Sequence, residues 1–249
     1  MTNGRLDTKN WIPNPDSVGV LKIDGPEVAN FEDQVKLFQA GEKDEVEFLR
    51  FRLRQGVYGQ RQPDSQMIRV KIPFGGLTAD QMDILGEAAA KYAPLKKGHI
   101  TTRENVQYHH VPLGETTDLL RMLGDAGLST REACGNTVRN VVAAPSAGVS
   151  KDEAFDVTPY AAAYARYFLR HPTTQNMPRK SKTAFSGSEK DEAMVLMHDV
   201  GMVARVQNGR RGFKIVLGGG LSTTPMMAQT LREFVPVEDF IKHCEAALR

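Results

Sequence analysis

Cysteine is scarce in this chain of 249 residues, which contains only Cys134 and Cys244. Two thiols cannot hold a zinc ion or an iron–sulfur cluster that needs a full set of thiolates, and they imply no disulfide framework. No apolar run reaches the roughly 18 residues of a transmembrane helix. Residues 1–7 also lack the apolar segment of a signal peptide, so we expect a cytoplasmic protein with no membrane contact.

An excess of either charge is also absent, because 32 Lys and Arg residues stand against 30 Asp and Glu residues, for a formal net charge of +2. Such a balance creates no global basic field, so any anion-binding site must be local. Aromatic residues make up only 7% of the chain, and no stacking pattern accompanies its lysine-rich stretch. We therefore expect no nucleic-acid partner.

The clearest periodicity lies in residues 67–73, where side chains alternate in type. The alternation predicts a strand whose residues Ile68 and Val70 face a core, with Arg69 and Lys71 on the other face. The next elements follow the order helix, strand, strand, helix, which completes most of a ferredoxin-like α+β unit. The first predicted helix begins at a capping box at 78–81 and ends before Pro94. The two strands are predicted at 99–102 and 106–111, on either side of a loop at 103–105, and the second helix at 116–127.

The remaining segments predict a second, larger α+β domain and an N-terminal arm. We expect domains at 1–55 (the arm), 56–128 (the ferredoxin-like half-domain) and 129–249 (the larger domain). The expected segments are an irregular stretch to about residue 30, charged helical sequence at 30–54, loops at 56–63 and 134–140, a helix at 160–170, a hairpin from 200–206 to 213–217 with a connection longer than two residues, and a closing helix at 237–248.

Lysines gather in the stretch Pro178-Arg179-Lys180-Ser181-Lys182. As a strand it would place Lys180 and Lys182 on one face and Arg179 on the other. Two neighbouring ammonium groups repel each other, and a small anion between them would offset that cost. Taken alone, however, these five residues are more typical of a charged and solvated edge strand.

Other single cations also lie in strand or loop contexts rather than on helix faces. Arg69 lies on the predicted strand, Arg103 lies in a turn with Gln107 on the returning strand, and Arg139 lies between two asparagines. Arginine suits bidentate binding of carboxylates, and lysine supplies a compact charge and a proton. Together they suggest a polycarboxylate cofactor and a small anionic substrate.

A metal site is not expected. His109 and His110 are adjacent on a strand and would point to opposite faces, and the other histidines have no chelating partner nearby in sequence. The run 218–220 lacks the Lys-Ser/Thr of a phosphate-binding loop and is better explained as a turn that permits close packing. Cys134 has no histidine nearby in sequence to activate it.

Five motifs resemble, in order and spacing, those of the sirohaem-dependent nitrite/sulfite reductases, and the resemblance covers roughly residues 45 to 249. The motifs are Thr101–Gln107, Gly135–Val141, Pro178–Lys182, His198–Gly201 and Gly218–Leu221. The resemblance implies an α+β fold, a ferredoxin-like half-domain followed by a larger nitrite/sulfite reductase-type domain. It also implies the first half of a tandem repeat, with sirohaem between the repeats. The family's four cluster cysteines, which hold a [4Fe–4S] cluster in the second repeat, have no counterpart here.

Site residues follow from the same resemblance. It implies that Arg69, Arg139, Lys180 and Lys182 surround the substrate, and that the cofactor's carboxylates are bound by Arg103, Gln107, Asn136, Arg139 and Arg179. Ser181 stands where an aromatic residue is common, and His99 stands where some relatives have arginine, so substrate preference or cofactor fit would differ.

Two functions follow as hypotheses. In the first, the complete enzyme carries out six-electron reduction of sulfite to sulfide or of nitrite to ammonia at sirohaem, with ferredoxin or a similar donor and a C-terminal repeat as partners. The isolated chain would then be inactive, since it lacks the cluster ligands. In the second, the chain is a non-catalytic half-module that binds a tetrapyrrole or another anion and acts only with a partner chain.

Overall fold

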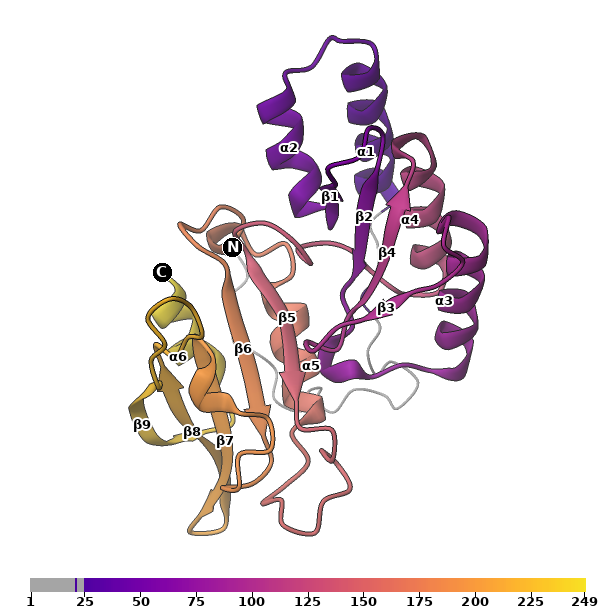
Figure 1. Ribbon diagram of the computed structural model, residues 1–249. Helices are drawn as coiled ribbons and strands as arrows, with labels where there is room; N and C mark the ends of the chain where they lie inside the picture. The colour runs from indigo at the N-terminus through magenta and orange to yellow at the C-terminus, as the bar shows by residue number, and fades with distance from the viewer. Residues whose placement is uncertain (1–20, 22–24) are drawn as a thin grey trace. The chain divides into compact units, whose positions relative to one another are not determined.

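The computed structural model describes Leu21 and residues 25–249 (Figure 1). Most of the stretch expected to be irregular to about residue 30 lies outside these residues. At residues 25–30 the expectation is wrong, because a helix begins at Gly25. The described chain forms two compact units. Of the described residues, the first unit contains Leu21, 25–140 and 169–180, and the second contains 141–168 and 181–249. The predicted domain limits at 55/56 and 128/129 stay predictions. We describe each unit separately.

The first unit combines a four-stranded sheet, in the order β1-β2-β4-β3, with helices. Its β-α-β-β-α segment is as the sequence predicts. The elements are α1 (Gly25–Gln39), α2 (Glu45–Arg54), β1 (Val57–Gly59), β2 (Gln66–Val70), α3 (Ala79–Tyr92), β3 (His99–Ile100), β4 (Val106–Val111) and α4 (Thr116–Asp125), with short 3-10 turns at Pro73–Gly75, Leu113–Glu115 and Pro172–Thr174.

The capping box predicted at the start of α3 is present. The Thr78 hydroxyl accepts a hydrogen bond from the Gln81 backbone N–H at 3.2 Å, and the Gln81 side chain accepts from the Thr78 N–H at 3.1 Å. These bonds satisfy first-turn amides that an uncapped helix leaves to water. The loop predicted at 56–63 is wrong in part, because Val57–Gly59 form strand β1 and pair antiparallel with β2.

The sheet of the first unit has one buried apolar face. Ile68, Val70, Tyr108 and Val111 belong to a core that also contains apolar residues of α1, α3 and α4. Figure 1 shows α3 and α4 along the same side of this sheet. Because side chains alternate along a strand, Arg69 and its neighbours on β4 project from the opposite face. This opposite face positions the candidate site.

The second unit contains a five-stranded sheet in the order β5-β6-β7-β8-β9, in which β6 and β7 are parallel and β7, β8 and β9 are antiparallel. Its core combines a small aliphatic cluster with packed aromatic rings. The elements are β5 (Val138–Ala143), α5 (Thr158–Phe168), β6 (Ser181–Ser186), β7 (Val200–Gln207), β8 (Arg210–Leu217), β9 (Gln229–Pro236) and α6 (Phe240–Leu248), with a 3-10 turn at Val195–Met197. The part of β5 up to residue 140 belongs to the first unit.

Two predictions for the C-terminal half are wrong in detail, and one strand was not predicted. The hairpin connection is two residues, not longer, because Gln207 pairs with Arg210 and both Asn208 and Gly209 have positive φ, as a tight hairpin turn requires. The expected loop at 134–140 is strand β5 from Val138 onward, and β9 has no predicted counterpart. The mixed polar pattern of β9, which is exposed along most of its length, explains why it was missed.

The glycine run behaves as predicted at Gly219. A Cβ at this position would lie 2.4 Å from the Leu196 carbonyl oxygen and 2.6 Å from that of His198. These contacts are too short for any side chain, so the run serves close packing of backbone.

Candidate anion-binding site

Arg69 lies at the centre of the polar face of the first unit's sheet. It pairs with Gln107 across β2 and β4, and His99 on β3 lies directly opposite Gln107 on the other side. With the Gln107 amide oriented so that its oxygen faces Arg69, this oxygen accepts hydrogen bonds from Arg69 Nη2 at 2.7 Å and Nε at 2.8 Å. Arg69 Nη1 also donates to the Ala133 carbonyl at 3.1 Å. All three guanidinium nitrogens therefore donate hydrogen bonds, which go to two acceptors.

Arg139, on β5, meets Arg69 at the same acceptor. Its Nε donates to the Ala133 carbonyl at 2.9 Å and its Nη1 to the Gly135 carbonyl at 3.2 Å. Burial lowers the pKa of Arg139, and the charge of Arg69 acts in the same direction. Two half-buried guanidinium groups around one carbonyl repel each other, and a bound anion would offset this cost. The pair is therefore a candidate anion-binding feature of the first unit.

Arg103 is fixed in the turn between β3 and β4. Its Nη2 donates to the Asn140 carbonyl at 2.5 Å, and Asn140 Nδ2 donates to the carbonyls of Ile72 at 2.6 Å and Arg103 at 3.0 Å. The sequence singled out Asn140 only as a neighbour of Arg139, but its side chain connects this turn to the end of β2. It thereby sets where Arg103 lies.

Asn136 connects the loop before β5 to the stretch that carries Arg179 and Lys180. Its backbone carbonyl accepts from the Met177 N–H at 2.9 Å, and its Nδ2 donates weakly to the Pro178 carbonyl at 3.4 Å. Arg179 and Lys180 follow directly and are exposed. Asn136 thus has an observed positioning contact in addition to its predicted contact with a cofactor.

Lys182 belongs to the second unit, where its backbone N–H donates to Asp199 Oδ2 at 2.8 Å. The stretch predicted as a strand from Pro178 begins as strand β6 only at Ser181. Strand alternation therefore does not place Lys180 and Lys182 on one face, because Lys180 precedes the strand. Of the predicted site residues, all except Lys182 lie in the first unit.

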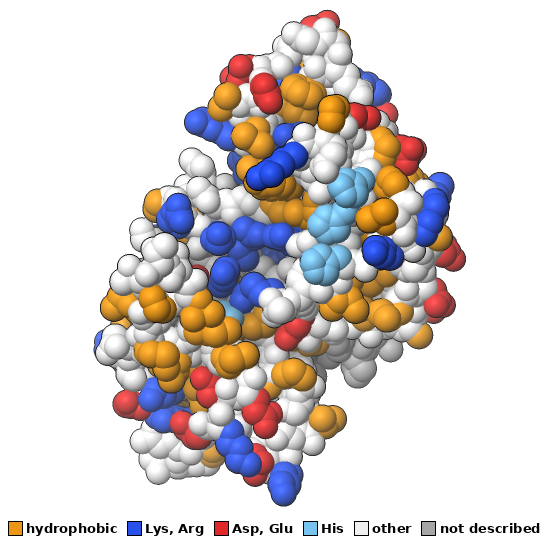
Figure 2. Space-filling view, viewed as in Figure 1, with side chains coloured by type: hydrophobic (Ala, Val, Ile, Leu, Met, Phe, Trp, Pro, Cys, Tyr) orange, Lys and Arg blue, Asp and Glu red, His pale blue; other side chains and the backbone are white. Residues whose placement is uncertain are grey.

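Two histidines that the sequence left without a partner lie together. His99 Nδ1 and His109 Nε2 are 3.3 Å apart, because pairing of β3 with β4 brings the two strands side by side. His110 lies next to them, and Figure 2 shows pale-blue histidine side chains as one patch on this unit. Burial lowers the pKa of His109, and the neighbouring histidines and Arg69 act in the same direction. Among the described residues, no group of three or more His, Cys, Asp or Glu side chains could hold a metal ion.

Both cysteines are buried and behave as packing residues. Burial raises the pKa of Cys134, although Arg69 and Arg139 oppose the shift, and burial raises the pKa of Cys244 to about 12. Thiols of this kind stay protonated and are poor ligands or nucleophiles. The pair therefore does not fit an iron–sulfur cluster.

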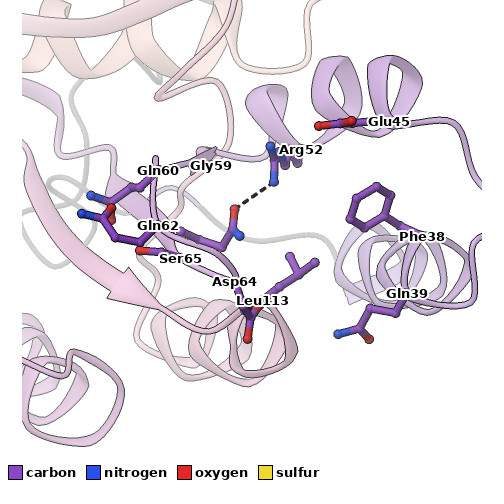
Figure 3. A pocket seen from close by; sticks show the side chains of 11 residues that line it. Phe38, Gln39, Glu45, Arg52, Gly59, Gln60, Gln62, Asp64, Ser65 and Leu113 are labelled. Carbon is purple, nitrogen blue, oxygen red and sulfur yellow. Dashed lines mark hydrogen bonds between the residues drawn. The ribbon is translucent and has the colours of Figure 1, made fainter.

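A cavity of about 350 Å³ in the first unit is lined by other residues (Figure 3). Arg52 in its wall donates to Gln66 Oε1 at 2.9 Å, while Glu45 and Asp64 contribute carboxylates to the lining. The two carboxylates would repel a polyanionic cofactor more than the single arginine would attract it, so the cavity does not suit such a ligand. None of the predicted site residues lines it.

Residues 58–126 match the nitrite/sulfite reductase ferredoxin-like half domain, and residues 134–249 match the nitrite and sulphite reductase 4Fe-4S domain. The chain belongs to the nitrite and sulfite reductase family, as the motifs predicted. No helix in the described part of the chain is long and apolar enough to cross a membrane.

Among curated relatives, the chain is 36% identical over 176 residues to a sulfite reductase [ferredoxin] of Mycobacterium tuberculosis, which covers 69% of this chain and 30% of the relative. It is 29% identical over 187 residues to a ferredoxin–nitrite reductase of Leptolyngbya laminosa, which covers 73% of this chain and 37% of that protein. The chain therefore spans about a third of the length of these relatives.

Solved structures confirm the fold. The Mycobacterium tuberculosis NirA protein superposes with a TM-score of 0.76 at 28% identity, over 89% of this chain and 46% of that chain. A dissimilatory sulfite reductase I gives a TM-score of 0.62 at 12% identity, over 96% and 78% of the two chains, and at this identity it supports the fold alone.

Proposed function

We propose that this chain supplies the N-terminal, anion- and cofactor-binding part of a sirohaem-dependent reductase that converts sulfite to sulfide or nitrite to ammonia with six electrons. The observation that carries the proposal is the shared Ala133 carbonyl, which holds the guanidinium groups of Arg69 and Arg139 together. Relatives that reduce sulfite and nitrite with ferredoxin support the substrate class and the donor.

The residues present fit a carboxylate-rich macrocycle. Gln107 lies on the polar face of the first unit's sheet, and Arg103 lies in the turn between β3 and β4. Asn136 lies in the loop before β5, and a hydrogen bond joins this loop to the stretch that carries Arg179. Sirohaem supplies the electron-transfer centre when it is bound. In this proposal the chain's own residues bind its carboxylates, and Arg69, Arg139, Lys180 and Lys182 bind the oxyanion. The two lysines also donate protons.

The residues do not fit the iron–sulfur cluster that the family's domain name includes. Cys134 and Cys244 are the chain's only cysteines, and both are buried in separate units. We therefore propose that the cluster ligands come from a C-terminal repeat, either on the same polypeptide or on a partner.

A reconstitution experiment tests this proposal. The purified chain loaded with sirohaem should show no reduction of sulfite or nitrite with reduced ferredoxin, and activity should appear only with a polypeptide that carries four cluster cysteines. Turnover by the loaded chain alone would contradict the proposed electron path. Failure of the chain to bind sirohaem even together with that polypeptide would contradict the cofactor assignment.

Lysine variants test the substrate side in the complete enzyme. We expect Lys180→Ala and Lys182→Ala to lower kcat for oxyanion reduction by about 10²-fold or more, in the range for lost electrostatic stabilisation, with little change in melting temperature. Lys151→Ala, at an exposed position, is the matched control and should change neither. Parallel losses of activity and stability would assign the lysines a structural role.

The second candidate function is a non-catalytic half-module that binds a tetrapyrrole or another anion and acts only with a partner. The two buried cysteines with raised pKa favour it, because they leave the chain without cluster ligands. Tight sirohaem binding with no activity in any combination with a cysteine-bearing repeat would support this function over the first.

A further inference from the structure

Two buried charges next to the arginine pair have no role in the site described so far. Glu132 has a side-chain exposure of 0% and Lys71 of 1%, and Lys71 Nζ lies 3.9 Å from Glu132 Oε2. The sequence predicted that Lys71 faces away from the core, as Arg69 does. In the structure Lys71 follows β2 directly and pairs with the segment after α4, where its backbone N–H donates to the Ser129 carbonyl at 2.7 Å. Removing two charges from water costs several kcal/mol per ion.

The ammonium of Lys71 holds both ends of the loop that leads into β5 and Arg139. It attracts Glu132 at the start of the loop and donates to the Val138 carbonyl at its end, at 3.2 Å. The Thr137 hydroxyl closes the same loop by donating to the Glu132 carbonyl at 3.3 Å. The Ala133 carbonyl, which receives both arginines of the site, lies inside this loop.

The carboxylate of Glu132 also holds a second segment. Its Oε1 accepts from the Arg170 backbone N–H and from Gln175 Nε2, both at 2.8 Å. Glu132 and Arg170 have φ of 59° and 61°, a left-handed conformation that is uncommon for such residues and persists only where contacts enforce it. The segment 170–175 leads directly to Pro178 and the cations Arg179 and Lys180.

We propose that Glu132, with Lys71 as its buried counter-ion, is the positioning residue that fixes Arg139 relative to the stretch carrying Arg179 and Lys180. The Oε1 atom of Glu132 accepts the bonds from the second segment and also lies 3.5 Å from Arg131 Nε. Its Oε2 atom has no hydrogen-bond partner among the described residues and interacts with Lys71 by charge. The importance of this position rests on the proposed function of those cations.

Glu132→Gln tests the proposal in the full 249-residue chain, because it preserves shape and removes the charge. We would record the guanidinium Nε–Hε resonances of Arg139 and Arg179 and the ammonium resonance of Lys180 by NMR, first without ligand and then in a sulfite titration. We expect shifted or doubled resonances without ligand and a loss of sulfite affinity of about tenfold. Glu42→Gln, at an exposed position of the same unit, should change neither.

The double variant Lys71→Met with Glu132→Gln separates positioning from stability. Replacing both charges by neutral groups of similar size should leave the melting temperature near that of the wild type, since a buried ion pair contributes little net stability. Sulfite affinity should stay reduced, because the bond from Lys71 to the Val138 carbonyl is lost.

The outcomes distinguish this proposal from the proposed function. Unchanged resonances and unchanged affinity in Glu132→Gln would overturn the positioning role, as would full recovery of affinity in the double variant. Changed resonances in a chain that binds no sulfite even as wild type would confirm the positioning role and contradict the proposed anion site.

Discussion

The sheet of the first unit buries one face under helices and leaves Arg69 and Gln107 on the other, whereas the second unit packs aromatic rings against its sheet. In the second unit Phe213 contacts four rings at centroid distances between 5.2 and 5.6 Å, which are those of Phe155, Tyr160, Phe185 and Phe240. In the first unit, two of the buried side chains are the charged residues Lys71 and Glu132. Both units have an apolar core, but the first unit also buries an ion pair and oriented polar contacts next to its candidate site.

The comparison is tested most strongly by Phe213→Ala. Loss of a ring with four aromatic neighbours should lower the free energy of unfolding of the second unit by about 3–5 kcal/mol, as large-to-small core changes do. Denaturant unfolding combined with amide hydrogen exchange would assign the loss to one unit. Equal loss of protection in both units would contradict the separate organisation.

Lys71 should make stability depend on pH in a defined window. Burial lowers the pKa of Lys71 from 10.5 to about 8, with Glu132 opposing the shift, so between these values the unfolded chain binds the extra proton. Unfolding free energy should therefore rise with pH from about 8 to 10.5, by about 3 kcal/mol in total.

Comparison with Lys71→Met isolates this contribution, because other groups titrate alike in both proteins. Urea unfolding at a series of pH values should show the wild type gaining stability relative to the variant as pH rises. A constant difference across the window would mean that Lys71 has an ordinary pKa in the folded protein.

A smaller effect is expected at the capping box of α3. Thr78→Ala removes the hydroxyl that accepts from Gln81 and should cost about 1 kcal/mol of unfolding free energy, within the range for lost N-caps. Thr78→Ser keeps the acceptor and serves as the matched control. Equal stability of the Ala and Ser variants would show that the cap contributes nothing here.

The smallest effect is expected at the surface of the second unit. Arg210 Nη2 lies 2.6 Å from Glu238 Oε1 at an exposed position. Arg210→Gln should change the free energy of unfolding by no more than about 0.5 kcal/mol, because solvent and salt screen such pairs. A larger loss in thermal unfolding would show that oriented charge also organises the second unit.

Local patterns determined much of the first unit. Alternation placed Ile68 and Val70 in the core, and the side chains at 78 and 81 identified the start of α3, because both signals depend on neighbours in sequence. The family motifs identified the fold, which the comparisons confirm. They also predicted the site cations, whose roles stay predictions. Motif order is a property of sequence and needs no geometry.

Only the tertiary structure decided which side chains meet. Strand pairing brought His99 to His109, and loop closure brought Arg69 and Arg139 to one carbonyl, although 70 residues separate the two arginines. Glu132 gave no signal in sequence, since its importance comes from burial and from partners far along the chain. Sequence thus determined which groups carry the charge. Folding decided where each charge is held, because long-range contacts depend on chain segments that no local pattern relates.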